Sequence, residues 1–587
     1  MNIRCSCRCA KCLMWLATLY AFVTVPTTYA EENNSAADNS TVNKTWTVPV
    51  SPISGSLVIC GGGRLPEEIL QQFLSLAGGK QAHLVVVPTA SSLAGKPEIE
   101  PRLSFWRQQP VASVAVLHTR SRDVADTPEF NRPLETATAV WFVGGHQDRL
   151  TDTYLGTLTE KMLRKVLGRG GVIGGTSAGA AIMSPVMIRQ GSPIPETGPG
   201  FGFLPGTVVD QHFLVRHRQT RLMHVLNDNP GLAGLGIDEG TALVVQGRRI
   251  KVIGDSQVLY CLPEAGTRVA KARTLKSGDE VDLVALSRAA IARAHQRTRK
   301  PAPAEPPVPQ LAKGTLVIVG GGSIPPEATQ RFIAAAGGVE APLVVVSTAT
   351  GEDPPAEAQT ADWLRKAGAK NIKYLHARNH QEATDPKLLA ILEKAKGVWF
   401  MGGRQWRLVD AFLDTVAEKA FHDVLARGGV IGGTSAGATI QAEFLVRGNP
   451  LGNSEIMAEG YEEGFGFLPG VAIDQHFSER DRFADMVDLK HSHPELLGLG
   501  IDEGTALIVQ GHEMEVLGAS QVAVFADEPT SSADEPGYEL LKAGDRYDLI
   551  ARRRALAKAT RAVQTIDEAD ADDPADSPVK AKLATRP

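Results

Sequence analysis

Gly-Gly-Thr-Ser-Ala-Gly-Ala occupies residues Gly174–Ala180 and recurs unchanged at Gly432–Ala438. Each copy follows a short apolar run and precedes residues that can begin a helix. A serine between glycines at a strand-to-helix turn is typical of a nucleophile elbow, because small neighbours allow a sharp turn that exposes the hydroxyl. We therefore interpret Ser177 and Ser435 as the nucleophiles of a duplicated serine-hydrolase domain.

Other motifs recur at a similar spacing, so the duplication extends through most of the chain. The two serines are 258 residues apart. Asp-Gln-His-Phe, which begins at Asp210, and Gly-Ile-Asp-Glu, which begins at Gly236, both recur 264 residues later. The second copy therefore has six additional residues between its serine and its histidine, within 449–463. A period of this length indicates two whole domains rather than the short units of a solenoid.

Composition divides the 587 residues into six segments. We expect a signal peptide (1–30), an N-terminal linker (31–53), a first domain (54–295), a proline-rich linker (296–313), a second domain (314–555) and a disordered tail (556–587). Basic residues precede an apolar run that is too short to span a bilayer comfortably, and small residues before and at Ala30 suit a signal peptidase. This pattern predicts a secreted or periplasmic protein, and its alternative is an uncleaved membrane anchor.

Charge and cysteine content argue against several classes of protein. The net charge is −5 and no basic stripe is present, so nucleic acid is not an expected partner. Four of the six cysteines lie in the predicted signal peptide, which leaves Cys60 and Cys261. Two unmatched cysteines indicate neither a disulfide framework nor a metal site. We expect no cofactor and no metal.

Short apolar strands alternate with helices in each repeat. In the first repeat we expect strands at Ser56–Cys60, His83–Val87, Val111–Leu117, Ala139–Val143, Gly171–Ile173, Thr207–Val209, Thr241–Gln246 and Arg249–Ile253, with helices at Glu67–Ala77, Asp152–Leu167 and Gln219–Asn227. Continuous apolar strands separated by helices predict an α/β fold with a mainly parallel sheet covered on both faces. Sites in such sheets form beyond the carboxyl ends of the strands.

Each repeat has a histidine and an acidic pair at matching positions after its serine. A serine needs a base, and the base needs an orienting acid. The simplest triads are Ser177–His212–Glu239 and Ser435–His476–Glu503. The chain order of serine, histidine and acid differs from that of α/β-hydrolases, in which the acid precedes the histidine.

Two points of the triad stay open at this level. Asp238 and Asp502 are adjacent to the glutamates and are alternative acids, whereas His118 and His376 recur in Leu-His-x-Arg and are rival bases. The backbone N–H groups expected to form the oxyanion holes are those of Gly145 and Ala178 in the first repeat and of Gly403 and Ala436 in the second.

Arginines follow each histidine. They are Arg216, Arg218 and Arg221 in the first repeat and Arg480 and Arg482 in the second. We expect them to surround a cleft and to hold carboxylates through bidentate contacts, and the alternative is a solvated helix face. Amides and acceptors near the nucleophile come from Gln147, Asp210, Gln211, Gln405, Asp474 and Gln475. Arginines and acceptors together suit a zwitterionic substrate.

Each repeat resembles the cyanophycinase branch of the serine peptidase family that also contains peptidase E, an aspartyl dipeptidase. The motifs that carry this resemblance are the elbow, the Gly-Gly-x-Gln loop, the Asp-Gln-His-Phe segment with its arginines, and Gly-Ile-Asp-Glu. The resemblance spans nearly all of each repeat. It implies a fold similar to class I glutamine amidotransferases (flavodoxin-like), with serine in place of their cysteine. It also implies hydrolysis of cyanophycin, a poly-aspartate with arginine on each β-carboxyl, to β-Asp-Arg dipeptides. The triad residues would be catalytic, and the arginines, amides and acceptors named above would line the substrate cleft.

The second repeat departs from the family pattern. Asp485 stands where the first repeat has Arg221, and the residue before the loop glutamine is His146 in one copy and Arg404 in the other. These departures predict two sites that differ in substrate or in strength. The alternative functions are a peptidase for other aspartyl or isoaspartyl peptides and a non-catalytic binding protein with the same fold. A pairing of the two repeats within the chain, or a homodimer, is the expected assembly.

Overall fold

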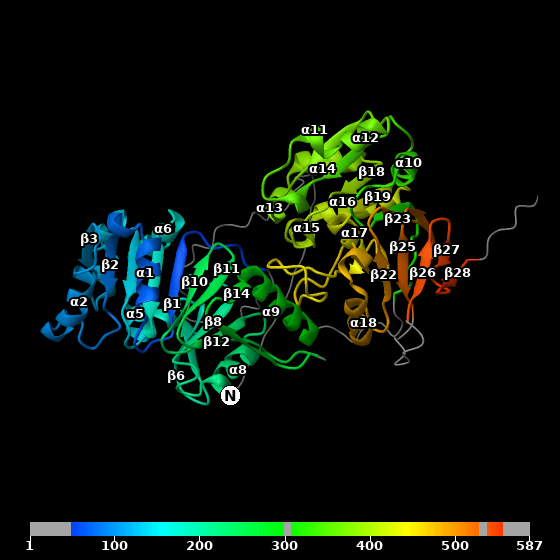
Figure 1. Ribbon diagram of the computed structural model, residues 1–587. Helices are drawn as coiled ribbons and strands as arrows, with labels where there is room; N and C mark the ends of the chain where they lie inside the picture. Colours follow the sequence, from blue (N-terminus) through cyan, green and yellow to red (C-terminus); the bar gives the residue numbers. More distant parts are fainter. Residues whose placement is uncertain (1–48, 267, 299–306, 527–536, 556–587) are drawn as a thin grey trace, which may run out of the picture. The chain divides into compact units, whose positions relative to one another are not determined.

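The computed structural model describes residues 49–266, 268–298, 307–526 and 537–555. The first repeat is coloured from blue to green and the second from green to red (Figure 1). The predicted signal peptide, the predicted C-terminal tail and most of the N-terminal linker lie outside the described residues, as does part of the proline-rich linker. Within these ranges, no helix combines the length and the apolar character that a membrane crossing requires.

The main sheet of repeat 1 has a parallel core. In spatial order its strands are β3 (Ser113–Val116), β2 (His83–Val87), β4 (Ala139–Phe142), β5 (Val172–Thr176), β1 (Ser56–Cys60), β10 (Thr241–Gln246), β11 (Arg249–Gly254) and β14 (Glu280–Asp282). The first five strands are mutually parallel. β10 pairs antiparallel with β1, β11 pairs antiparallel with β10, and β14 pairs antiparallel with β11. Cys60 pairs with Thr176, and Phe142 pairs with Gly175. The loops after these strands therefore meet at one edge of the sheet.

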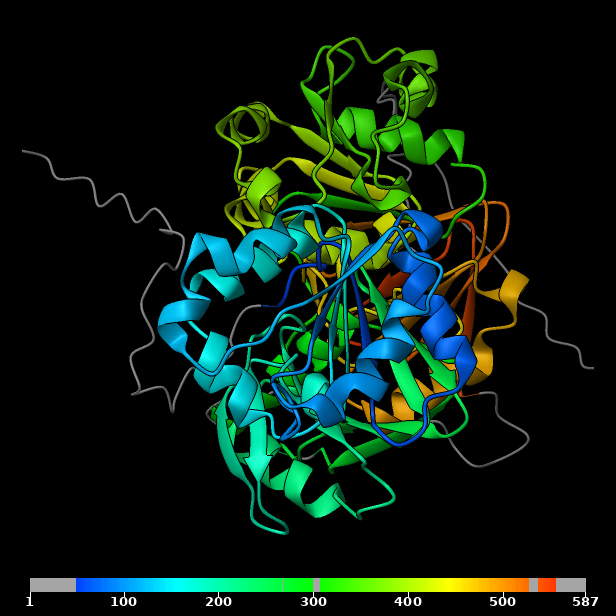
Figure 2. The same cartoon turned by 90° about the vertical axis from the view of Figure 1, so that its left-hand side faces the viewer.

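Helices cover both faces of this sheet (Figure 2). On one face lie α1 (Glu67–Leu76) and α2 (Glu100–Arg107), and on the other lie α4 (Pro128–Thr136), α5 (Asp148–Tyr154), α6 (Leu158–Gly168) and the short α7 (Ala178–Ala181), with α3 (Arg122–Ala125) beside α4 and α5. Phe73 and Trp106 pack against the first face, and Leu134 and Leu163 pack against the second. The apolar strands are thus buried on both sides, as the sequence predicts.

The single helix predicted over Asp152–Leu167 is wrong, because the chain forms two helices there. α5 ends at Tyr154 and α6 begins at Leu158. Between them, Gly156 has a φ of 78°, a left-handed conformation that a continuous helix does not contain. Arg122 donates to the carbonyl groups of Asp152 and Leu155 and so takes up helix-terminal acceptors.

A second, smaller sheet follows the elbow and was only partly predicted. Its strands are β8 (Thr207–Gln211), β9 (Ala233–Ile237), β12 (Gln257–Leu262) and β13 (Lys271–Lys276), accompanied by the hairpin β6 (Val186–Gln190) and β7 (Glu196–Pro199) and by the helices α8 (Gln219–Asp228) and α9 (Leu283–Thr298). β8 and β9 are parallel, and β12 and β13 are antiparallel to their neighbours. The last residues of β8 and β9 lead directly into the predicted base and acid.

The main sheet of repeat 2 repeats the strand order of repeat 1 and adds one strand, β28, at its edge. Its strands are β17 (Ile372–Leu375), β16 (Leu343–Val346), β18 (Gly397–Phe400), β19 (Val430–Thr434), β15 (Thr315–Val319), β23 (Thr505–Gln510), β24 (Glu513–Gly518), β27 (Arg546–Asp548) and β28 (Arg553–Arg554). Its smaller sheet has β20 (Ala442–Phe444), β21 (Leu468–Gln475), β22 (Leu497–Ile501), β25 (Gln521–Phe525) and β26 (Glu539–Lys542). The helices are α10 (Pro326–Ala335), α11 (Glu357–Thr360), α12 (Asp362–Lys366), α13 (His380–Ala383), α14 (Pro386–Lys394), α15 (Gln405–Phe412), α16 (Val416–Ala426), α17 (Ala436–Thr439) and α18 (Phe483–Ser492).

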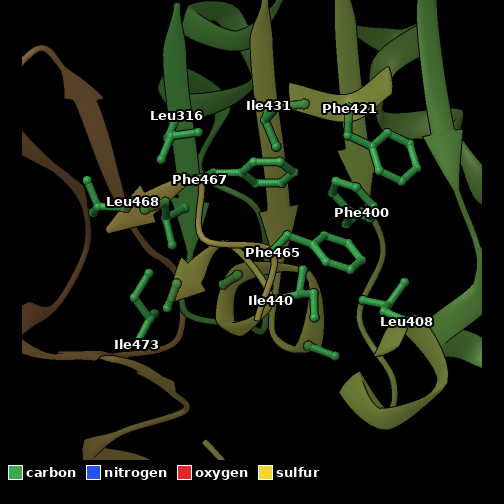
Figure 3. Packing of buried hydrophobic residues seen from close by; sticks show 14 of the residues in the cluster. Leu316, Phe400, Leu408, Phe421, Ile431, Ile440, Phe465, Phe467, Leu468 and Ile473 are labelled. Atoms are coloured by element: carbon green, nitrogen blue, oxygen red, sulfur yellow. The ribbon is translucent and has the colours of Figure 1, made fainter. Parts of the chain in front are cut away.

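Aromatic side chains pack beside the short helix that follows the elbow of repeat 2. Phe400, Phe421, Phe465 and Phe467 cluster beside Ile440, which follows α17 (Figure 3). The ring centroids of Phe400 and Phe421 are 4.9 Å apart, and those of Phe400 and Phe465 are 5.7 Å apart. Each such pair stabilises a core by about 0.5–1.5 kcal/mol beyond its buried area. The C-terminal end of α17 therefore packs against a layer of aromatic side chains.

The predicted α/β class is confirmed for both repeats. Each has a mainly parallel main sheet covered by helices on its two faces. The antiparallel additions and the smaller sheet extend this pattern on the side where the base and the acid lie.

Candidate active site

Ser177 lies in a strained turn between β5 and α7. Its φ of 54° and ψ of −108° are rare for a residue with a side chain. A Cβ atom at Gly175 would lie 2.5 Å from the carbonyl oxygen of Gly179, so only glycine permits the strand and helix to cross this closely. The N–H of Ser177 donates to the carbonyl of Cys60 at 3.0 Å, which ties the turn to β1.

The same geometry recurs at Ser435, between β19 and α17. Its φ is 55° and its ψ is −115°. Its N–H donates to the carbonyl of Val319 at 3.0 Å. Both serines are half-buried, and the strain occurs at the residue that directly follows the last residue of each strand. A strained residue that recurs at matched positions motivates a functional hypothesis.

The structure brings each serine together with the predicted histidine and glutamate. His212 Nε2 lies 2.8 Å from Ser177 Oγ, and His212 Nδ1 lies 2.5 Å from Glu239 Oε1. In repeat 2 the distances are 2.9 Å from His476 Nε2 to Ser435 Oγ and 2.5 Å from His476 Nδ1 to Glu503 Oε1. Each chain of hydrogen bonds has the geometry of a hydroxyl, its base and an orienting acid.

The neighbouring aspartates have a different role in this geometry. Asp238 accepts hydrogen bonds from the backbone N–H groups of Leu214 and Val215 and from the Ser256 hydroxyl. Asp502 likewise accepts from the N–H of Ser478 and from the Ser520 hydroxyl. These carboxylates hold the loop after each histidine, whereas the glutamates contact the imidazoles.

The rival histidines contact other groups. His118 Nδ1 lies 2.9 Å from Thr89 Oγ1. His376 lies 3.0 Å from Ser347 Oγ through Nδ1 and 3.0 Å from the carbonyl oxygen of Glu352 through Nε2. Neither histidine is therefore hydrogen-bonded to a serine of the two elbows.

Burial lowers the pKa of His212 below its ordinary value of 6.5, and the positive charge of Arg216 lowers it further, while the hydrogen bond with Glu239 opposes the shift. Burial and Arg480 lower the pKa of His476 in the same way, against the hydrogen bond with Glu503. A lowered pKa keeps the imidazole neutral at neutral pH, which is the form that can accept the serine proton.

A glycine loop after β1 makes room for each imidazole. Gly62 has a φ of 111°, and a Cβ atom there would lie 2.7 Å from both ring nitrogens of His212. At Gly321 the corresponding distances to His476 are 2.6 and 2.7 Å. The backbone N–H of His212 donates to the carbonyl of Gly61 at 2.7 Å. The sequence places this glycine loop, Gly61–Gly63, after a predicted strand at the edge of the sheet where a site is expected, and it recurs at Gly320–Gly322. It does not predict that the loop lies against the imidazole.

The predicted oxyanion donors lie next to the nucleophiles. A Cβ atom at Gly144 would lie 3.4 Å from Ser177 Cβ, so the loop that contains Gly145 adjoins the serine. Ala178 is the first residue of α7, and Ala436 is the first residue of α17. Among the described residues, no backbone acceptor binds the N–H of Gly145, Ala178, Gly403 or Ala436. These N–H groups are free to face a developing oxyanion.

Two of the three predicted arginines in repeat 1 are engaged in a buried cluster. Arg221 is 4% exposed and binds both carboxylate oxygens of Asp210, which is completely buried. Arg218 donates to the side-chain oxygen of Gln211 at 3.2 Å and to its carbonyl at 2.6 Å. Arg216 is exposed. Of the three arginines predicted to surround a cleft, Arg221 is buried, Arg218 is half-buried and Arg216 alone is exposed. The position of Arg216 at a substrate cleft stays a prediction.

Repeat 2 builds the corresponding cluster from a different arginine. Arg447, which is 1% exposed, donates to Asp474 from Nε at 3.0 Å and from Nη2 at 2.8 Å. Its Nη2 also donates to Asp485, the residue that replaces Arg221, at 2.6 Å. Arg482 donates to Asp474 and to Gln475, and Arg480 is exposed.

Arg447 was not predicted as a site residue. It matches Arg189 of repeat 1, which instead forms a partly exposed ion pair with Asp148. The sequence did indicate that a different cation was needed. Asp485 replaces the arginine that pairs with the buried aspartate in repeat 1, so another cation has to neutralise Asp474. That cation could be located only with coordinates, since the loop that carries it is remote in sequence.

The loop glutamines contact the segment after each elbow. Gln147 donates to the carbonyls of Ile188 and Arg189 at 2.8 and 2.5 Å. Gln405 donates to the carbonyl of Val446 at 3.0 Å and is 2% exposed. Arg404 donates to the carbonyls of Asn449 and Gly452 and so holds the longer loop of repeat 2 beside the glutamine.

In the part of the chain that the structure describes, no three His, Cys, Asp or Glu side chains are grouped so that they could hold a metal ion. Cys60 and Cys261 are both free and buried, and burial raises the pKa of the Cys261 thiol to about 11. Neither thiol is therefore a nucleophile at neutral pH.

Comparisons with known proteins match each repeat separately. The model of peptidase family S51 matches residues 57–253 and again residues 311–517. A cyanophycinase from Geminocystis herdmanii (strain PCC 6308) is 30% identical over 258 residues, which cover 41% of this chain and 95% of the relative. A cyanophycinase from Trichormus variabilis (strain ATCC 29413 / PCC 7937) is 28% identical over 264 residues, which cover 42% of this chain and 88% of the relative. The crystal structure of a peptidase from an acI-B1 actinobacterium covers 40% of this chain and 98% of its own, at 26% identity and a TM-score of 0.32.

Proposed function

The chain belongs to peptidase family S51, once in each repeat, and from this premise we propose that it is a secreted cyanophycinase-type enzyme with two Ser-His-Glu sites. It is a serine-type peptidase. The observation that carries the proposal is the pair of hydrogen-bonded chains from serine through histidine to glutamate, one in each repeat.

The proposed reaction has two stages. His212 accepts the proton of Ser177 as Oγ attacks the peptide carbonyl carbon, and the N–H groups of Gly145 and Ala178 stabilise the oxyanion. The C–N bond then breaks, and the imidazolium gives its proton to the leaving amine. In the second stage the imidazole takes a proton from water, the hydroxide attacks the acyl ester, and Ser177 leaves with that proton restored. Glu239 orients the imidazole throughout.

The proposed substrate is cyanophycin, a poly-aspartate with arginine on each β-carboxyl, cleaved to β-Asp-Arg dipeptides. Two relatives that are 30% and 28% identical over 258 and 264 residues of this chain are named cyanophycinase. Arg216 and Arg480 are exposed near the proposed bases, where a guanidinium can bind a substrate carboxylate.

The test is turnover of purified cyanophycin by the wild type, Ser177→Ala, Ser435→Ala and the double variant, with products identified by mass. We expect β-Asp-Arg from the wild type, a lower rate in at least one single variant and no product from the double variant. Full activity of the double variant would exclude these nucleophiles. Hydrolysis of short aspartyl peptides without any release from the polymer would replace the proposed substrate by aspartyl peptides in general.

Secretion is a further part of the proposal and is supported by the basic and apolar pattern of residues 1–30. N-terminal sequencing of protein recovered outside the cytoplasm should give a chain that begins after Ala30. Recovery of full-length protein in the membrane fraction would support the uncleaved anchor instead. The pairing of the two repeats, or of two chains, stays a prediction.

A further inference from the structure

The segments that follow the two proposed bases differ in charge. Leu214–Arg221 contains three arginines and no acidic residue, a formal net charge of +3. Ser478–Asp485 contains two arginines and three acidic residues, a formal net charge of −1. Both segments begin two residues after a catalytic histidine, so the difference lies beside the reacting groups.

Part of this difference is neutralised inside each repeat. Arg221 is paired with the buried Asp210, and Asp485 is paired with Arg447. The charges that still distinguish the surfaces are those of Glu479 and Asp481, which are both exposed. At the aligned positions repeat 1 has Val215 and His217.

Glu479 is in direct contact with the catalytic acid segment. Its Oε1 accepts a hydrogen bond from the backbone N–H of Glu503 at 3.0 Å. The aligned Val215 is 58% exposed. One site therefore presents a carboxylate next to its triad, where the other presents an apolar side chain to solvent.

The exposed arginines beside the two bases have different neighbours in the sequence. Arg216 and Arg480 each lie close enough to lower the pKa of the adjacent base. Arg480 is flanked in sequence by Glu479 and Asp481, whereas no acidic residue of Leu214–Arg221 offsets Arg216. The exposed part of Leu214–Arg221 beside site 1 is consequently cationic, whereas the exposed part of Ser478–Asp485 beside site 2 has one cationic and two acidic side chains.

We propose that the two sites divide aspartyl substrates by charge, an inference that rests on the proposed function. Site 1 prefers peptides with free carboxylates beside the cleaved bond. Site 2 prefers peptides that carry a guanidinium there, and Glu479 is the residue that determines this preference. One added charge at a solvated site changes a binding preference by roughly 1.5-fold to fivefold.

The experiment uses full-length chains with one intact site. Ser435→Ala retains site 1 and Ser177→Ala retains site 2. Each is assayed with tri-aspartate and with the same backbone bearing arginine on its β-carboxyls, which adds one guanidinium per residue and keeps the number of carboxylates. We expect the kcat/KM ratio of arginylated to plain peptide to be higher for site 2 by at least about 1.5-fold, and the difference to shrink as sodium chloride is raised from about 20 to about 500 mM.

Glu479→Gln in the Ser177→Ala chain isolates the charge, because the amide oxygen still accepts the hydrogen bond from Glu503. We expect its ratio to shift towards that of site 1. Val215→Glu in the Ser435→Ala chain is the reciprocal variant and should shift towards site 2.

Equal ratios for the two single-site chains would overturn the division of substrates and leave the proposed function intact. An unchanged ratio in Glu479→Gln would overturn the role of Glu479. If neither single-site chain hydrolyses either peptide or cyanophycin, the proposed function itself fails.

Discussion

Glycine at position 62 is required by the imidazole that lies against it. A Cβ atom there would overlap the ring of His212 and would lie 2.7 Å from both of its nitrogens. We expect Gly62→Ala in the Ser435→Ala chain to lower kcat by roughly 100-fold, because a displacement of about 1 Å at a catalytic group costs about that much. The measurement is steady-state hydrolysis of an aspartyl peptide.

Gly78→Ala is the matched control for this variant. Gly78 has a φ of 102°, close to the 111° of Gly62, but a Cβ atom there would meet nothing within 4 Å. Both variants therefore carry similar backbone strain, and only one disturbs the ring. Comparable losses in the two would show that strain rather than contact with His212 is responsible.

The lowered pKa of the proposed bases determines the acid limb of the rate profile. Burial and Arg216 lower the pKa of His212 below 6.5, so the neutral, proton-accepting form persists at lower pH than for a free histidine. We expect kcat/KM of the Ser435→Ala chain to be level around neutral pH and to fall only below 6.5. Arg216→Gln removes a cation that disfavours protonation, so the midpoint should move to higher pH. A midpoint that stays fixed would contradict this electrostatic role.

The elements that the sequence predicts best are those whose composition matches their burial. Most parallel strands of the main sheet of repeat 1 are continuous apolar runs, and these strands were predicted to within a few residues. β9 was missed because Ala-Gly-Leu-Gly-Ile has two glycines in five residues, which is unusual for a strand. The structure explains the second one, since a Cβ atom at Gly236 would overlap the ring of Phe213.

The triad could be predicted because each member stands in a short motif that occurs twice. The glutamates were preferred as the acids, but the adjacent aspartates stayed open as alternatives, because both carboxylates directly follow the same strand. Only coordinates distinguish Glu239, which contacts the ring, from Asp238, which binds Leu214 and Val215. The exchange of Arg221 for Arg447 was also beyond sequence, because the two residues lie on different elements and neutralise equivalent aspartates.

Because of that exchange, we expect the replacement of two aligned arginines, Arg447 and Arg189, to lower the free energy of unfolding by different amounts. Arg447→Ala leaves the fully buried Asp474 with Arg482 as its remaining guanidinium partner among the described residues, and breaking a buried pair costs about 3–5 kcal/mol. Arg189→Ala removes an ion pair whose partners are 43% and 33% exposed, and this costs at most about 1 kcal/mol. The measurement is the urea concentration at which fluorophosphonate labelling of Ser435 or of Ser177 is lost.

Adding Asp485→Arg to Arg447→Ala recreates the arrangement of repeat 1. This double variant should regain part of the lost stability of repeat 2, because an arginine on α18 replaces the one removed from the loop. If Arg447→Ala and Arg189→Ala lower the stability of their repeats equally, the buried cluster around Asp474 does not stabilise repeat 2 more than the exposed ion pair stabilises repeat 1.

At the scale of the whole molecule, the duplication predicts two independent reactive serines in one chain. Each elbow has its own base and acid within the same repeat, and no group of either hydrogen-bonded chain comes from the other repeat. A fluorophosphonate should therefore label the wild type at two equivalents per chain, each single serine variant at one, and the double variant at none, with intact mass as the measurement. The two labelling rates should differ, because Val215 and Glu479 give the two serines different electrostatic surroundings, and the rate at Ser435 should be the more sensitive to Glu479→Gln. A single equivalent on the wild type would mean that one repeat retains the fold and the triad geometry without an activated serine.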